Sequence, residues 1–247
     1  LSGKYRLVAD YNDNFKVATE NNDESIFELQ FLGDVTNTGF NPGLSNSGVW
    51  RDPRGYLPPT NKNANSSVIH DWVYNTFVNS KDASGHTDPR MFGTLIFDDT
   101  KSEINARTGD EVRIFDNKTF REYYGVKGFG VAKKYKAACR KGIDWTLATR
   151  NPGDNFYMWN GRANGLNQTE IRYADVLLMY AEAVVKGGTQ GSLTALDAVN
   201  QVRARVGMPA VSSVDMDVIE HERILELTQE GHRFFDLLRW GKVAQRF

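Results

Sequence analysis

The sequence predicts a mainly α-helical fold with long irregular loops and a few short β-strands. Over residues 169–247, apolar side chains recur at steps of three and four, which is the spacing of one face of a helix. Of the 20 asparagines, 19 lie at or before Asn167, and asparagine favours turns because it tolerates left-handed backbone. We therefore expect a loop-rich, ligand-facing part over residues 1–168 and a helical scaffold over residues 169–247. The two parts are expected to form one integrated domain of a chain that is truncated at both ends.

Three short elements are predicted before residue 168. Apolar and polar side chains alternate over residues 27–31, which is typical of a half-buried strand. An apolar stripe that includes Trp72 and Phe77 predicts a helix near residues 66–80. Residues 92–97 are largely apolar over a short run and are expected to form a further strand.

Two helices are predicted to pair directly after residue 168. The first carries an apolar stripe from Ile171 to Val185 and ends at a pair of glycines. The second carries a stripe from Leu193 to Val206, with Ser192 as its candidate N-cap. Because the link between them is short, we expect the two helices to form an antiparallel hairpin.

Two further helices complete the predicted scaffold. The third is expected to begin near Asp215 or Asp217 and to end at Gly231, because acidic caps favour helix starts and glycine favours helix ends. The fourth is expected to run from about Arg233. Its inward-facing residues are expected to be Phe234, Leu237 and Leu238.

Composition and charge exclude several classes of partner. The chain has 247 residues with 30 basic and 31 acidic side chains, so a global electrostatic attraction to nucleic acid or to an anionic membrane is not indicated. The best apolar run, Val176 to Val185, is only half the ~20 residues that a membrane-spanning helix needs. A basic stretch from Lys127 to Lys141 is interpreted as a guard on an exposed strand edge. We therefore predict no nucleic-acid partner.

One acidic cluster resembles the start of a calcium loop. Asp10, Asn12 and Asn14 have the right spacing, but Phe15 stands where the loop needs glycine and Asn21 where it needs glutamate. We interpret the cluster as a turn or a helix cap. The sequence therefore predicts no metal site here.

The histidines and glycines form no recognisable catalytic motif. His221 precedes a glutamate as in the helical zinc-protease motif, but position 225, where the second histidine belongs, is Leu225. No nucleophile elbow, phosphate-binding loop or dinucleotide fingerprint occurs. The sequence therefore predicts no catalytic residue, no cofactor and no enzymatic activity.

The most informative feature is a set of aromatic side chains within two loops rich in asparagine, glycine and proline. A sugar ring has apolar C–H faces and a rim of hydroxyls, so its site needs flat aromatics with amide or guanidinium groups beside them. The candidate ligand-binding residues are Trp50, Arg51, Tyr56, Asn61, Tyr157 and Trp159. The alternative is that these aromatics pack as small cores under the loops.

Four blocks of the C-terminal part resemble the SusD/RagB family of outer-membrane glycan-binding lipoproteins. They span residues 171–183, 198–207, 222–227 and 230–241, and weaker similarity extends over nearly the whole chain. The resemblance implies a tetratricopeptide-like helix-pair scaffold, of which this chain holds the C-terminal part. Charged side chains in these blocks are expected to tie the helices together as a buried or half-buried network. They are Arg203, Arg205, Glu222, Arg223, Glu226, Arg233 and Asp236.

The function that the resemblance implies is binding without catalysis. A protein of this family binds an oligosaccharide or polysaccharide at the outer-membrane cell surface and delivers it to a TonB-dependent, SusC-like transporter. Membrane contact is then made only through a lipid anchor upstream of this chain. Two other functions stay open: a helical scaffold for protein partners, and a glycoside hydrolase, whose paired acids are defined by a spatial separation that a sequence does not give.

Overall fold

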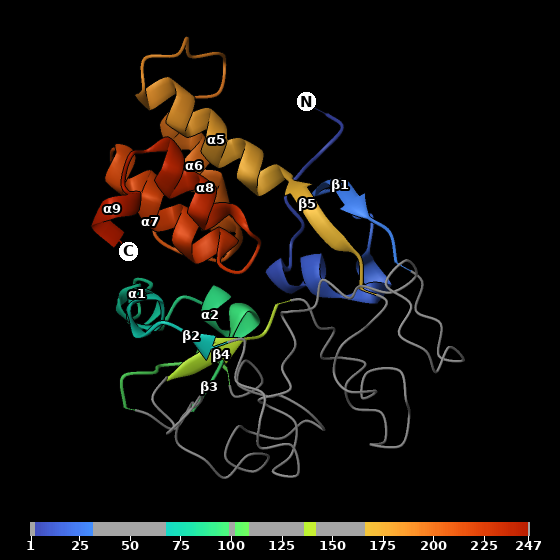
Figure 1. The fold of residues 1–247 in the computed structure, drawn as a ribbon, viewed down its shortest axis with the longest axis vertical. Coiled ribbons are helices and arrows are strands. Elements are labelled where there is room, and N and C mark those ends of the chain that lie inside the picture. The colour runs from blue at the N-terminus through green and yellow to red at the C-terminus, as the bar shows by residue number, and fades with distance from the viewer. Residues whose placement is uncertain (1–2, 32–67, 99–101, 109–135, 142–165, 247) are drawn as a thin grey trace.

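The described residues form a mainly helical molecule with a few short strands, which confirms the predicted fold class (Figure 1). The computed structural model describes residues 3–31, 68–98, 102–108, 136–141 and 166–246. The helices are η1 (Tyr11–Phe15), η2 (Val17–Thr19), α1 (Asp71–Asn79), α2 (Arg90–Thr94), α5 (Tyr173–Val185), α6 (Ala195–Arg205), α7 (Met216–Leu227), α8 (His232–Arg239) and α9 (Val243–Arg246). The strands are β1 (Ser25–Leu29), β2 (Val68–Ile69), β3 (Leu95–Phe97), β4 (Ala137–Cys139) and β5 (Gln168–Arg172).

Helices α5 and α6 form the predicted pair and share an apolar core with α7 (Figure 1). Helix α5 begins at Tyr173, two residues after the predicted start, because residues 168–172 pair with β1 as strand β5. Ile171 is therefore a partly exposed strand residue, not a helical core residue. The N-cap of α6 is Thr194 instead of Ser192, since Thr194 Oγ1 accepts a hydrogen bond from Asp197 N at 2.9 Å.

Helices α7 and α8 lie in sequence where predicted, but α8 presents a different face to the core. Asp215 is the N-cap of α7, which ends at Leu227, four residues before the predicted Gly231. In α8 the buried residues are Asp236 and Leu237, whereas Phe234 is 51% exposed and Leu238 is also exposed. The predicted inward face was therefore right for Leu237 and wrong for Phe234 and Leu238, because an ion pair of Asp236 with α7 turns that side of the helix inward.

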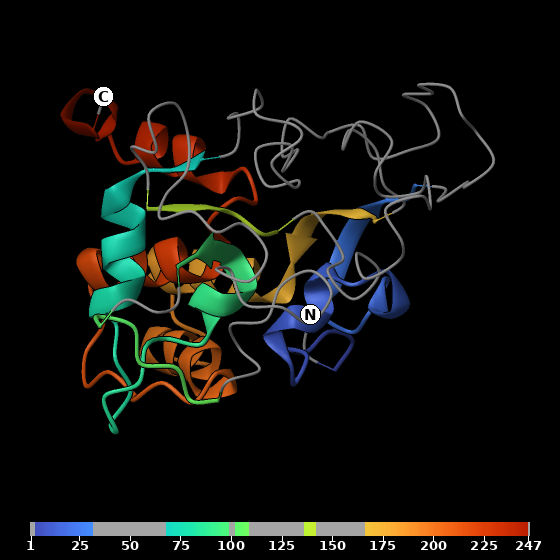
Figure 2. The same cartoon turned by 90° about the horizontal axis from the view of Figure 1, so that it is seen from below.

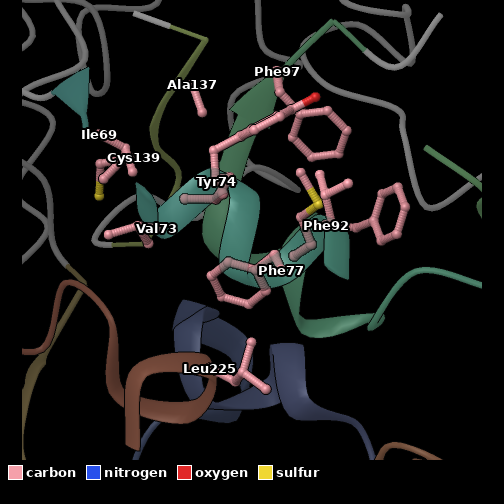
Figure 3. Packing of buried hydrophobic residues seen from close by; sticks show 12 residues of the cluster. Ile69, Val73, Tyr74, Phe77, Phe92, Phe97, Ala137, Cys139 and Leu225 are labelled. Carbon is pink, nitrogen blue, oxygen red and sulfur yellow. The ribbon is translucent and has the colours of Figure 1, made fainter. Parts of the chain in front are cut away.

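Helix α1 packs on the three-stranded antiparallel sheet β2–β4–β3 and on α7. Tyr74 and Phe77 are the most buried residues of α1, and the Phe77 ring faces Leu225 of α7 (Figure 3). Ile69, which lies within the predicted helix range 66–80, belongs to strand β2 before the helix. The buried face of α1 therefore differs from the predicted stripe. Trp72 lies at the margin of this face, and 47% of its surface is exposed.

Helix α2 occupies the first half of a segment, residues 92–97, that was predicted as a strand. Its first turn follows Asp88, whose carbonyl and carboxylate accept hydrogen bonds from the backbone N–H groups of Met91 and Arg90, both at 3.0 Å. The strand β3 is thus confined to residues 95–97. Helix α2 lies between α1 and η1 (Figure 2).

The side chains of strand β1 face the opposite way to the prediction. Phe27 is 52% exposed and Leu29 is also exposed, while Glu28 lies on the more covered side. The carboxylate of Glu28 accepts hydrogen bonds from Asn21 N at 3.2 Å and from Asn167 Nδ2 at 3.0 Å. These polar contacts hold the glutamate side of the strand against the protein, so the apolar side faces outward.

Candidate functional site

A network of buried charged side chains joins the helical scaffold to the N-terminal part of the chain. At its centre the fully buried carboxylate of Glu226, on α7, accepts hydrogen bonds from Arg90, Arg172 and Arg205. These arginines come from α2, from the last position of β5 and from α6. A single carboxylate on α7 therefore binds three separate elements.

Arg172 extends the network towards the N-terminus. Its buried guanidinium donates to Glu24 at 2.7 Å and to the two carboxylate oxygens of Glu230 at 2.6 and 2.9 Å. Glu24 also accepts from Arg205 at 2.9 Å and from the backbone N–H of Val8 at 3.0 Å. These contacts fix the strand pair β1–β5 to the scaffold.

Arg90 extends the network to α2. Its Nε and Nη2 donate to the two carboxylate oxygens of Asp88 at 3.0 and 2.7 Å. Its Nη1 donates to Glu222 at 2.5 Å and to Glu226 at 3.0 Å. Glu222 in turn accepts from Arg203 at 2.8 Å, so α2, α6 and α7 are bound through one continuous set of ion pairs.

Lys141 is a buried cation of the same network, and its position corrects the interpretation of the basic stretch over residues 136–141; residues 127–135 lie outside the described residues. Strand β4, just before it, is the central strand of its sheet and not an exposed edge. The Lys141 ammonium donates to Glu230 at 2.7 Å and to the carbonyl of Glu226 at 2.9 Å. It also lies 5.2 Å from the centre of the Tyr11 ring, a distance at which a cation and an aromatic face attract each other.

Opposite charges keep two buried acids of the network, Glu226 and Glu230, ionised. Burial by itself raises the pKa of the Glu226 carboxyl, but nearby arginines, first Arg205 and then Arg172, outweigh it and hold that pKa well below its ordinary value. Burial is likewise opposed at Glu230 by Arg172 and Lys141, and the pKa of Glu230 falls to about 2. Burial lowers the pKa of Lys141 to about 8. The carboxylates of Glu226 and Glu230 are already bound by cations, so neither is free to act as a general acid or base.

A second buried cluster ties α8 to α5 and α7. Arg223 donates from Nε and Nη2 to the two carboxylate oxygens of Asp236 at 2.7 and 2.9 Å, and from Nη1 to Asp175 at 2.7 Å. Arg233 lies at the margin of this region, where it pairs with Glu220 at 2.7 Å and its side chain is 27% exposed. Arg233 and Asp236 thus both form ion pairs between helices, as predicted, but the pair of Arg233 is half-buried and lies outside the Arg223 cluster.

We expect Asp236→Ala to lower the melting temperature far more than Arg233→Ala. Loss of Asp236 deprives buried Arg223 of two hydrogen bonds, and removal of one partner from a buried pair costs about 3–5 kcal/mol. Arg233 makes a partly exposed pair, which contributes about 0.2–1 kcal/mol. Thermal unfolding followed by circular dichroism measures both variants, with Lys186→Ala, beside the glycines that end α5, as the control. Equal losses for Asp236→Ala and Arg233→Ala would contradict the assigned difference in burial.

The sequence located about half of the charged residues in the two clusters and missed two that are central to the first. The predicted residues that lie in the two clusters are Arg203, Arg205, Glu222, Arg223, Glu226 and Asp236. The two central residues that it missed are Arg90 and Arg172, each at the end of a short element where no helical periodicity marks the buried side. It also missed their partners Glu24, Asp88 and Glu230, together with Lys141 and Asp175. The available signal was that Arg90 follows Asp88 and Pro89 and that Arg172 lies within a block that resembles the SusD/RagB family.

The predicted ligand-binding residues lie outside the described residues. Trp50, Arg51, Tyr56 and Asn61 belong to residues 32–67, and Tyr157 and Trp159 belong to residues 142–165. Their contacts and exposure are therefore not part of the site that the structure describes.

The described residues that flank these two segments lie next to one another. At one end, Phe31 N donates to Asn167 Oδ1 at 2.9 Å, beside the antiparallel pair β1–β5. At the other end, Val68 of β2 pairs with Ala138 of β4, three residues before Lys141. Both segments therefore begin and end at the same two sheets, each of which the charged network contacts.

Two other predicted features have structural roles. The carboxylate of Asp10 caps η1, since Oδ1 accepts from Asn12 N at 2.9 Å, which confirms the interpretation as a helix cap. His221 lies 3.1 Å from Ser80 Oγ through Nε2. Within the described residues, no group of three or more metal-ligating side chains is close enough to hold a metal ion. The helices of the described part include none with the length and apolar character needed to cross a bilayer.

Comparison with known proteins decides the family. The model of the SusD family matches residues 23–247. The chain belongs to the SusD family. Among curated relatives, a SusD-like protein from Bacteroides ovatus is 24% identical over 236 residues, which cover 95% of this chain and 37% of that protein.

Solved structures of SusD proteins share the fold of this SusD-family chain. A SusD superfamily protein from Bacteroides vulgatus has a TM-score of 0.67 and 27% identity, covering 98% of this chain and 46% of that one. Surface glycan-binding protein A from Bacteroides thetaiotaomicron, in complex with laminarihexaose, has a TM-score of 0.63 and 22% identity, covering 99% of this chain and 48% of that one. The chain thus spans less than half the length of these relatives.

Proposed function

We propose that this chain binds an oligosaccharide or polysaccharide at the cell surface and is not an enzyme. The observation that carries the proposal is the match to the SusD family over residues 23–247, because a solved protein with the same fold holds laminarihexaose. The buried acids of the network support binding over hydrolysis, since those described above are held by arginine or lysine.

We further propose that the two flanked segments, 32–67 and 142–165, supply the glycan site together. Their described ends are held at the same two sheets, and fixed ends reduce the entropy lost when a loop orders around a ligand. In this proposal the aromatic residues stack on sugar faces, while the guanidinium and amide groups bind hydroxyls. The site residues are Trp50, Arg51, Tyr56, Asn61, Tyr157 and Trp159.

Delivery of the glycan to a TonB-dependent, SusC-like outer-membrane transporter completes the proposed function. The full-length protein would be held at the outer membrane by a lipid anchor. Uptake of a labelled glycan by cells with and without the full-length protein tests delivery, with transporter abundance measured in both. Equal uptake at equal transporter abundance would exclude a delivery role and leave the binding proposal to its own test.

We expect Trp50→Ala to weaken glycan binding at least thirtyfold without unfolding the protein. Loss of a central aromatic from a binding site costs about 2 kcal/mol or more. Isothermal titration with laminarihexaose and a panel of soluble polysaccharides measures the affinity, and circular dichroism measures folding.

The matched control is Trp72→Ala, which removes a half-exposed tryptophan of α1 outside both segments. We expect this control to bind neutral glycans like the parent. If Trp50→Ala also binds glycan like the parent, Trp50 does not stack on the sugar, and Trp159 becomes the next residue to change. Reducing-sugar release measured on the same samples tests the hydrolase alternative, and sustained release abolished by one acid substitution would overturn the non-enzymatic assignment.

A further inference from the structure

A pocket of about 300 Å³ lies between the C-terminal end of α1, the end of α6 and the middle of α7. Its polar lining consists of Thr76, Asn79, Ser80, Lys81, Arg203 and His221. Met208 adds an apolar wall, and neither aspartate nor glutamate is among the lining residues that the structure describes. The lining is therefore basic and polar.

The two basic side chains of the lining, Arg203 and Lys81, each retain a hydrogen-bond donor for a ligand. Arg203 is held by Nε, which donates to a backbone carbonyl at 2.7 Å, and by Nη1, which donates to Glu222 at 2.8 Å. Its Nη2 has no hydrogen-bond partner among the described residues. Lys81 donates to Thr87 Oγ1 at 2.8 Å and to the carbonyl of Glu103 at 3.0 Å, which uses two of its three N–H groups.

The neutral part of the lining is held in one arrangement. The hydroxyl of Ser80 donates its proton to the carbonyl of Thr76 at 2.9 Å, so the contact at 3.1 Å from His221 Nε2 must be donated by the imidazole. Burial lowers the pKa of His221. A ligand that complements the remaining donors needs to be an acceptor with negative charge, because guanidinium and ammonium groups make their strongest hydrogen bonds to anions.

We infer that this pocket binds an oxyanion, either a carboxylate or a sulfate group, through Arg203, Lys81 and Asn79. The pocket volume is roughly ten times the share of one water molecule, so it has room for an acidic sugar as well as for a free inorganic ion. The pocket lies outside residues 32–67 and 142–165, and the inference therefore does not rest on the proposed glycan platform.

Isothermal titration of the protein with sodium sulfate, sodium glucuronate and glucose, at constant ionic strength, tests the inference. We expect sulfate and glucuronate to bind and glucose not to bind. Tighter binding of glucuronate identifies the source of the anion as an acidic sugar, whereas equal or tighter binding of sulfate identifies a free inorganic ion. Failure of both anions to bind overturns the inference, whatever the outcome with laminarihexaose.

Variants locate the anion in the pocket. Arg203→Gln and Lys81→Gln are each expected to weaken anion binding about tenfold, the effect of one lost charge-assisted hydrogen bond. Lys4→Gln removes an equal charge at an exposed position outside the pocket and should leave the affinity unchanged. Because Arg203 also binds Glu222, its variant is interpreted only if circular dichroism shows a folded protein. If Arg203→Gln is unfolded, Lys81→Gln provides the test. An unchanged anion affinity in Lys81→Gln overturns the assignment.

Discussion

Arg90→Ala is expected to lower the free energy of unfolding by about 3–5 kcal/mol, the cost of removing one partner from a buried ion pair. The guanidinium of Arg90 is fully buried and contacts the carboxylates of Asp88, Glu222 and Glu226. The substitution removes the bidentate hydrogen-bond partner of Asp88. It also removes one of the positive charges that neutralise Glu222 and Glu226. Since α2 is attached to α7 through these contacts, we expect the loss to affect the whole described fold.

Urea unfolding followed by tryptophan fluorescence measures this effect, and Arg6→Ala provides a matched control. Arg6 also pairs with an acid, Asp23, but both side chains are mostly exposed. Exposed pairs contribute about 0.2–1 kcal/mol because solvent screens them. Comparable unfolding free energies for the two variants would show that the buried network contributes no more than a surface pair.

The parts of the fold that the sequence predicted well depend on local patterns. The stripe through Ala174, Leu178 and Ala181 defines the buried side of α5, and these three residues are fully buried. Asp215 was predicted as a possible start of α7 because an acidic cap acts on backbone groups within one turn. Such signals lie within a few residues of the element that they specify, so they can be recognised without knowledge of the tertiary structure.

The errors arise where contacts between distant residues decide the outcome. The outward face of Phe27 depends on Glu28 and its partner Asn167, 139 residues away. The burial of Arg172 depends on Glu24, 148 residues away, and on Glu226. Neither contact leaves a periodic pattern in the local sequence, so alternation alone assigned the wrong face and no pattern marked the arginine.

For the candidate site, the sequence indicated which residues have the chemistry to bind a sugar, and the structure showed where the ends of their two segments are held. The aromatic residues Trp50 and Trp159 stay predictions as ligand contacts. The described flanks add that both segments start and finish at the sheets β1–β5 and β2–β4–β3. Because Arg172 and Lys141 fix these sheets to the helical scaffold, the network is expected to support ligand binding by holding the ends of both segments in place.

Phe77→Ala is the second change expected to have a large effect, a loss of about 3–5 kcal/mol in the free energy of unfolding. The ring of Phe77 is completely buried in the cluster between α1, the three-stranded sheet and α7, where it faces Leu225 (Figure 3). Truncation removes apolar contacts and leaves a cavity, because the surrounding strands and helices restrain one another and can relax only in part.

The same helix provides the control for Phe77→Ala. Trp72 is larger than Phe77, but it is half exposed and its ring lies 5.7 Å from the guanidinium carbon of Arg233. An exposed cation–aromatic contact contributes about 0.5–1 kcal/mol, so Trp72→Ala should cost far less than Phe77→Ala although it deletes more atoms. Urea unfolding of both variants distinguishes burial from residue size as the cause. A greater loss for Trp72→Ala would mean that the outer face of α1 is covered in solution and that the core assigned to Phe77 is misplaced.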